Sequence, residues 1–250
     1  KTPHIAFEVQ ATISSATVVL LFEVHHDLHA RCLLPFIVRL AVIDNHIGPL
    51  RIPADLIRDE AAAVRALAAK AGAPLHLVGH SYGGTTALRL MLQNPDLVRR
   101  FVIIEPMLLN LLVDAGEDDV LADLYTMAKG FLHNVEVRGP ETAWKIFLDF
   151  RNGDGAWEGY PQKTRDNFLH RTQGHVANLK SNMKNQTPAP ELATIATPTL
   201  AVKTQDATGF DGRMVEILAD AMPDCTLLTL EDTAHMVPLT HPELTAEVIL

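Results

Sequence analysis

A serine between two glycines, in the segment Gly79-His80-Ser81-Tyr82-Gly83, has residue types and spacing that suit nucleophilic catalysis. An apolar run at residues 75–78 precedes it and a helical pattern begins near Thr85, so the sequence predicts a sharp turn between a strand and a helix. Such a turn would strain the backbone at Ser81 and project its Oγ from the edge of a sheet. Glycines on both sides allow strand and helix to approach closely because they have no Cβ. We therefore predict that Ser81 is a nucleophile rather than a bystander in a glycine-rich turn.

The amide group after the serine has an expected part in the same chemistry. The N–H of Tyr82 should point towards the oxyanion that forms when Ser81 attacks a carbonyl group. The N-terminus of the following helix would add partial positive charge at that place. We therefore expect Tyr82 to be one donor of an oxyanion hole.

A serine nucleophile needs a general base, and the chain offers twelve histidines that only position can separate. His235 follows the last expected strand, residues 226–230, and a loop at the carboxyl end of that strand lies at the same sheet edge as Ser81. We therefore predict His235 as the base. His241 is expected to cap a helix or to lie on the surface, and the His80 side chain is expected to point away from Ser81.

The elements that must hold these residues alternate between short apolar runs and helical patterns. Runs that are apolar almost throughout suit strands of a sheet covered on both faces. Strand–helix alternation predicts parallel strands with right-handed crossovers, and hence an α/β fold with a mostly parallel sheet and helices on both faces. The expected strands are residues 4–9, 17–24, 40–44, 75–79, 101–105, 199–203 and 226–230.

The stretch between Pro106 and Pro198 breaks this alternation, because no convincing strand occurs in it. Helix-like segments near residues 118–129, 141–150, 162–171 and 176–184 occupy it, separated by turns rich in Gly, Asn and Asp. We predict a helical cap, residues 107–197, inserted into an α/β core formed by residues 1–106 and 198–250.

The composition limits the classes of partner. The 250 residues include 21 Lys and Arg against 30 Asp and Glu, a net charge of −9, and 48% are hydrophobic. This balance indicates a soluble, compact protein, and the lack of a basic cluster argues against nucleic acid as the main partner. No apolar run reaches the ~18–20 residues of a membrane span. No leader peptide is visible, which favours a cytoplasmic protein, although a chain whose leader had been removed would look the same.

Metal and cofactor sites find little support in the sequence. A cluster of polar residues at positions 25–29 contains three histidines, but it lacks a metal-binding pattern and is interpreted as a polar loop. Neither a phosphate-binding loop nor a dinucleotide fingerprint is present. The two cysteines, Cys32 and Cys225, lie far apart and are expected to be reduced core thiols. We expect a small-molecule substrate and neither metal nor cofactor; the sequence leaves the oligomeric state open.

Two segments together carry a resemblance to a known family. The segment Gly79-His80-Ser81-Tyr82-Gly83-Gly84, with Ala234-His235-Met236 followed by His241-Pro242-Glu243, resembles the α/β-hydrolase superfamily. The similarity covers most of the chain in the order of strands and helices, the position of the cap and the order of the catalytic residues. It implies a sheet of about eight strands, a Ser–acid–His triad and no metal.

The resemblance places the acid of this triad after one of two strands. After the strand that follows the cap, Asp206 lies one residue from the family position and the usual glycine is missing. After the strand that follows the serine's helix, Glu105 ends an apolar run, 24 residues beyond Ser81 (105 − 81). We favour Glu105, keep Asp206 as the alternative and Asp211 as a further candidate; a salt-bridged strand end is the non-catalytic interpretation of Glu105.

The resemblance also implies a second oxyanion donor after an early strand, where the family commonly has a His-Gly pair. That pair is absent here. The backbone N–H of Val24 is the expected donor, with Glu23 next, and Glu23 would bring a carboxylate close to the oxyanion.

These residues together predict a serine hydrolase that cleaves carboxylic esters of a small to medium, fairly apolar substrate. The apolar side chains of the expected cap favour an apolar acyl or alkyl group. The same triad would also serve a lactonase, a thioesterase or a C–C bond hydrolase. A non-catalytic ligand-binding protein on the hydrolase fold and a lyase of the hydroxynitrile type are the alternatives from other classes.

Overall fold

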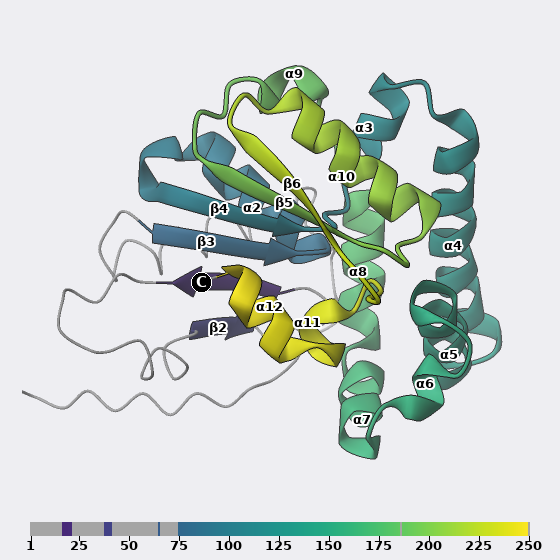
Figure 1. The fold of residues 1–250 in the computed structure, drawn as a ribbon. Helices are drawn as coiled ribbons and strands as arrows, with labels where there is room; N and C mark the ends of the chain where they lie inside the picture. The colour runs from purple at the N-terminus through teal and green to yellow at the C-terminus, as the bar shows by residue number, and fades with distance from the viewer. Residues whose placement is uncertain (1–16, 22–37, 42–64, 66–74, 186, 250) are drawn as a thin grey trace, which may run out of the picture.

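The computed structural model describes residues 17–21, 38–41, 65, 75–185 and 187–249 (Figure 1). Six strands of this part of the chain form one sheet in the order β2-β1-β3-β4-β5-β6. The strands are β1 (Thr17–Leu21), β2 (Val38–Ala41), β3 (Leu75–His80), β4 (Val98–Ile104), β5 (Thr199–Thr204) and β6 (Cys225–Leu230). Each overlaps a strand expected from the sequence, and the expected strand at residues 4–9 lies outside the described residues.

The directions of the strands agree with the prediction of a mostly parallel sheet. Strands β3, β4, β5 and β6 run parallel, but β1 is antiparallel to both of its neighbours, β2 and β3. The sheet is therefore mostly but not wholly parallel. Apolar periodicity indicates that a segment is a strand but not which way it runs, because either direction buries the same side chains. The count of about eight strands stays a prediction, since much of the N-terminal part is not described.

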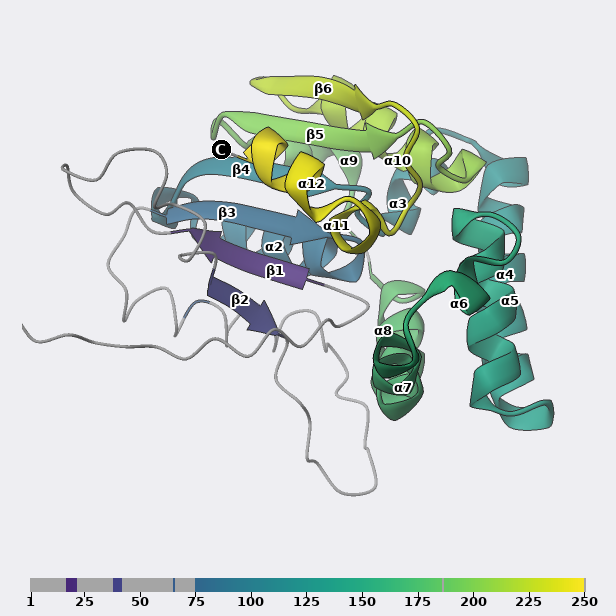
Figure 2. The same cartoon turned by 60° about the horizontal axis from the view of Figure 1, so that its bottom comes forward.

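Helices cover both faces of this sheet, as the α/β prediction requires (Figure 2). Successive residues of β4 show why, since Ile103 packs with Leu88 and Met214 on one face, whereas Ile104 packs with Val237 on the other. This alternation is the two-residue period of a strand buried on both sides. The helices packed around the sheet are α2 (Tyr82–Gln93), η3 (Pro95–Leu97), α10 (Gly209–Ala221), α11 (Val237–Thr240) and α12 (Pro242–Ile249).

Between β4 and β5 the described residues form helices and no strand. The helices are α3 (Leu109–Asp114), α4 (Asp118–Val137), α5 (Pro140–Asn152), α6 (Ala156–Gly159), α7 (Gln162–His170), α8 (Thr172–Asn182) and α9 (Ala189–Leu192). We refer to residues 107–197 as the helical insertion. Its buried apolar cluster combines aliphatic side chains with aromatic rings, among which Phe131 lies edge-on to Trp144 and Phe147. Among the helices described here, none has both the length and the apolar character needed to cross a membrane.

Candidate active site

Ser81 alone makes the turn between β3 and α2. Its backbone angles, φ 54° and ψ −128°, lie in a region that residues other than glycine rarely adopt. The turn is possible because the strand and the helix touch at glycines. A Cβ on Gly79 would lie 2.7 Å from the Cα of Gly84 and 2.9 Å from the Cβ of Ala87. The local sequence thus forces the strained turn that was expected from it.

The side chain of Ser81 faces His235, which lies in the loop after β6. Its Oγ is 3.1 Å from Nε2 of His235. Both residues are buried, with 5% and 2% of their surface exposed. His80 holds this loop from the strand side, because its Nε2 lies 2.8 Å from the backbone oxygen of His235. The structure therefore gives His80 a supporting position that sequence reasoning left unassigned.

Glu105 lies on the other side of the imidazole, at the carboxyl end of β4. Its Oε2 is 2.7 Å from Nδ1 of His235, and its Oε1 accepts hydrogen bonds from the backbone N–H and the hydroxyl of Thr204. An ionised carboxylate only accepts hydrogen bonds, so Nδ1 carries the proton in this contact and Nε2 is left as an acceptor for the Ser81 hydroxyl. Ser81, His235 and Glu105 thus form one hydrogen-bonded chain.

The other sequence candidates occupy different positions. Asp206 is exposed, and the side-chain contacts described for His235 do not include it. Asp211 is fully buried in the first turn of α10, with Oδ2 at 3.9 Å from Nδ1 of His235. Tyr82 is the first residue of α2, where amide groups point out along the helix axis. Val24 and Glu23 lie outside the described residues.

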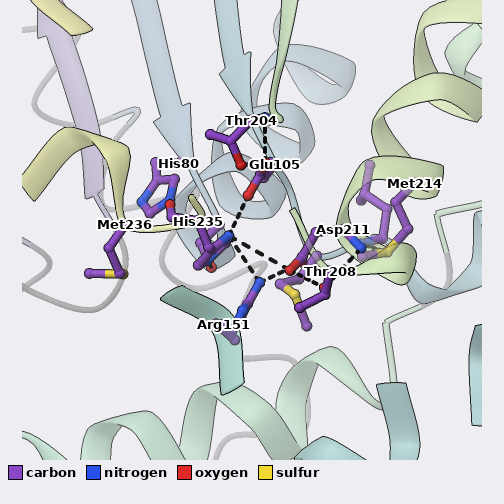
Figure 3. A network of polar contacts seen from close by, with 12 residues as sticks. His80, Glu105, Arg151, Thr204, Thr208, Asp211, Met214, His235 and Met236 are labelled. Carbon is purple, nitrogen blue, oxygen red and sulfur yellow. Dashed lines mark hydrogen bonds and ion pairs between the residues drawn. The ribbon is translucent and has the colours of Figure 1, made fainter. Parts of the chain in front are cut away.

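A residue that sequence reasoning missed, Arg151, completes the site (Figure 3). It lies at the end of helix α5 of the insertion, is buried, and donates through Nη2 to Oδ1 of Asp211. The same nitrogen is 3.0 Å from Nδ1 of His235. The spacing of Trp144, Leu148 and Arg151 could have revealed it, because i, i+4 and i+7 share one helix face and a cation on an otherwise apolar face needs a partner.

Burial sets the charge state of this site. It is the main cause that lowers the pKa of His235 to about 3; the Arg151 cation lowers this pKa further, and the Asp211 carboxylate raises it. Burial likewise lowers the pKa values of His80 and His175 to about 3. All three imidazoles are therefore neutral at pH 7, which is the state in which His235 can accept a proton.

Three side chains here have atoms that could serve as metal ligands. One ligand atom each from Glu105, Asp211 and His235 lies within 4.8 Å of the others. The Arg151 guanidinium contacts Asp211 and His235 of this set, so a positive charge is already in place among them. A metal ion bound to all three would have to displace that guanidinium.

Comparison with known families agrees with this geometry. The family model described as the alpha/beta hydrolase family matches residues 22–248. The chain belongs to the alpha/beta hydrolase family. The family membership supports a hydrolase, and it fits both the turn at Ser81 and the helical insertion after β4. No curated protein sequence matches the chain significantly.

Solved structures of the same fold have low sequence identity to this chain. A thermophilic esterase aligns with a TM-score of 0.60 at 22% identity, covering 77% of this chain and 71% of its own. Est816, an N-acyl homoserine lactone degrading enzyme, aligns at 0.58 and 17%, covering 79% and 75%. A 2-hydroxy-6-oxo-6-phenylhexa-2,4-dienoate hydrolase from Rhodococcus sp. strain RHA1 aligns at 0.55 and 12%, covering 77% and 69%. These similarities show that the fold is shared, and the three proteins are named for different activities.

Proposed function

We propose that this protein is a serine hydrolase of carboxylic esters that works through an acyl-enzyme intermediate. The main support is the buried chain of contacts from Ser81 Oγ through both ring nitrogens of His235 to Glu105, with distances of 3.1 and 2.7 Å. A hydroxyl, a neutral imidazole and a carboxylate in this order are the groups needed to activate a serine.

Each group has a defined part in the reaction. Nε2 of His235 takes the Ser81 proton while Oγ attacks the ester carbon, and Glu105 stabilises the imidazolium that results. The N–H of Tyr82 donates to the oxyanion. The Nε2 proton then passes to the leaving alcohol, which leaves an acyl group on Ser81. His235 next deprotonates a water molecule, which attacks the acyl carbon and releases the acid and free Ser81.

The helical insertion acts as a cap in this proposal. Two neighbouring residues at the end of α5 touch the histidine loop, because Arg151 contacts His235 and the Oδ1 of Asn152 accepts from the N–H of Met236 at 2.8 Å. Met236, the residue after His235, belongs to the buried apolar cluster of the insertion that also contains Phe131 and Phe147. Such apolar surroundings favour an apolar acyl or alkyl group in the substrate.

A p-nitrophenyl ester assay with a fluorophosphonate label tests the proposal. The Ser81→Ala variant should lose hydrolysis by about 10³-fold or more and lose labelling, while its circular dichroism stays that of the native protein. The matched control is Ser181→Ala, which removes a buried hydroxyl in α8 and should keep both ester hydrolysis and labelling. Hydrolysis retained by Ser81→Ala would refute the proposal. A panel of lactones, thioesters and C–C bond substrates separates ester hydrolysis from the other reactions open to the same residues.

A further inference from the structure

Two groups compete for one nitrogen of His235. Nδ1 lies 2.7 Å from the Glu105 carboxylate, which can only accept, and 3.0 Å from the Arg151 guanidinium, which can only donate. In a neutral imidazole this nitrogen carries either a proton or a lone pair. It can therefore donate to Glu105 or accept from Arg151, but not both at once.

The two arrangements differ in what faces Ser81. When Nδ1–H donates to Glu105, the lone pair on Nε2 can receive the serine proton. When Nδ1 accepts from Arg151, the proton sits on Nε2 and the imidazole is no base for Ser81. The wrong tautomer in a Ser–His–Asp site costs about 10⁴-fold in kcat. A cation so close to Nδ1 would therefore lower kcat unless another group kept its N–H from donating to that nitrogen.

Asp211 is placed to restrain this cation. Its Oδ1 accepts from Nη2 of Arg151, and its Oδ2 accepts from the hydroxyl of Thr208 at 2.6 Å. Asp211 is fully buried, so its charge is not screened by water. Nε of Arg151 has no hydrogen-bond partner among the residues described, which leaves Asp211 as the anchor of the guanidinium. The aromatic rings of Phe147 and Phe210 lie 5.5 and 5.8 Å from Cζ of Arg151.

We infer that Asp211 is a positioning residue: it binds Arg151 of the helical insertion and so keeps Nδ1 of His235 protonated towards Glu105. This inference rests on the proposed function, in which His235 is the base. It gives Asp211 a different role from that of a triad acid, since its Oδ2 is 3.9 Å from Nδ1 whereas Oε2 of Glu105 is 2.7 Å away. Arg151 itself is not required for the chemistry.

The charges around His235 are consistent with this division of roles. Among the residues that the structure describes, the charged and titratable groups around it are Glu105 after β4, His80 from β3, Asp211 from α10, Arg151 from α5 and His175 from α8. Arg151 and Asp211 act on the pKa of His235 in opposite directions, so that each offsets the other. Loss of Asp211 alone leaves a buried cation beside the base, whereas loss of both leaves Glu105 in sole control of Nδ1.

A double-variant cycle tests the inference. Asp211→Leu removes both carboxylate oxygens, and kcat for a p-nitrophenyl ester at pH 7.5 should fall by about 10²- to 10⁴-fold. Adding Arg151→Met to it should restore kcat to within about tenfold of the native protein, because a buried ion pair can often be replaced by an apolar pair. If Asp211→Leu does not fold, Asp211→Asn gives a milder version, in which the amide oxygen still accepts but the charge is gone.

The tautomer can be read without any activity. In protein labelled with ¹⁵N-histidine, the signals of His235, assigned with a His235→Gln variant, should show Nδ1 protonated in the native protein and in the double variant. The Asp211 single variant should shift the proton to Nε2. A single variant with native kcat and native tautomer overturns the inference, as does a double variant no more active than the single one. Failure of the proposed function is recognised separately, because native protein would then neither hydrolyse esters nor react with fluorophosphonate at Ser81.

Discussion

The backbone N–H and the hydroxyl of Thr204 both donate to the same carboxylate oxygen of Glu105, across the carboxyl ends of β4 and β5. This leaves the second oxygen of Glu105 for His235. The two hydrogen bonds to Oε1 fix the orientation of a carboxylate that is fully buried, so that Oε2 is held where it can accept from Nδ1–H of His235. Thr204 on the neighbouring strand therefore positions the Glu105 carboxylate for its contact with His235.

Removal of one of these donors should weaken both the fold and the site. Thr204→Val keeps the shape and the backbone N–H but loses the hydroxyl, and a hydrogen bond to a charged group is worth about 1.5–3 kcal/mol. We expect the free energy of unfolding in urea to fall by roughly that amount and kcat to fall by about tenfold. The control is Thr199→Val on the same strand, whose hydroxyl donates to the Thr197 carbonyl at 2.8 Å, far from the site. It should cost stability but leave kcat unchanged.

The choice of acid predicts a ranking between two variants. Glu105→Gln puts an amide where His235 needs an anionic acceptor, so kcat should fall by about 10²- to 10⁴-fold. Asp206→Asn alters an exposed side chain and should leave kcat within about twofold. Steady-state kinetics on one ester with both variants decides the matter. A larger loss in Asp206→Asn than in Glu105→Gln would contradict the assignment.

The sequence predicted the residues that local pattern determines and missed those that only packing brings together. Ser81 was predicted as the nucleophile because a turn between glycines is a local signal, and His235 as the base because it follows a strand whose end must share the edge of the sheet; the structure brings the two side chains into contact. Glu105 could be favoured but not chosen, since several carboxylates end strands or loops at that edge. Arg151 was missed although its place on an apolar helix face marks it as a cation that needs a partner, because that partner, Asp211, is 60 residues away and cannot be identified from the local sequence. The direction of β1 was not predicted because strand direction has no periodicity of its own.

The cation beside the base predicts a shift in the pH profile. Burial and Arg151 both lower the pKa of His235, which must be neutral to act, so the acid limb of kcat/KM should lie well below pH 6.5 in the native protein. Arg151→Met removes one of these causes, so the pKa should rise and the acid limb should move to higher pH. Profiles of both proteins over pH 4–8, limited to the range in which they stay folded, measure the shift. A shift to lower pH would mean that the charges act differently from this account.

Three buried histidines predict that the protein loses stability in mild acid. The pKa values of His80, His175 and His235 are lowered from 6.5 to about 3 in the folded state. The unfolded chain therefore binds more protons below pH 6.5, and each histidine costs about 1.4 kcal/mol per pH unit until the folded pKa is reached. Urea unfolding at pH 7.5, 6 and 5 should show that the free energy of unfolding decreases as the pH is lowered. His175→Phe keeps a ring between Phe131 and Phe147 and removes one titrating group, so the free energy of unfolding should depend less steeply on pH. The same steepness in this variant and in the native protein would contradict the part given to His175.

The space around two glycines, one at the contact between β3 and α2 and one in α4, predicts opposite effects of substitution by alanine. A Cβ on Gly79 would lie 2.7 Å from a backbone atom of Gly84, which cannot move aside without moving the helix and Ser81 with it. Gly79→Ala should therefore cost about 1–3 kcal/mol of stability and lower kcat more than it raises KM.

Gly130 lies inside α4, and no described side chain comes within 4 Å of the place that an added Cβ would take. Gly130→Ala should raise the free energy of unfolding by about 0.5–1 kcal/mol through helix propensity alone and leave kcat unchanged. Urea unfolding and ester kinetics on both variants provide the measurement, and a Gly79→Ala protein as stable and active as the native one would mean that the strand and helix are not in contact at this turn.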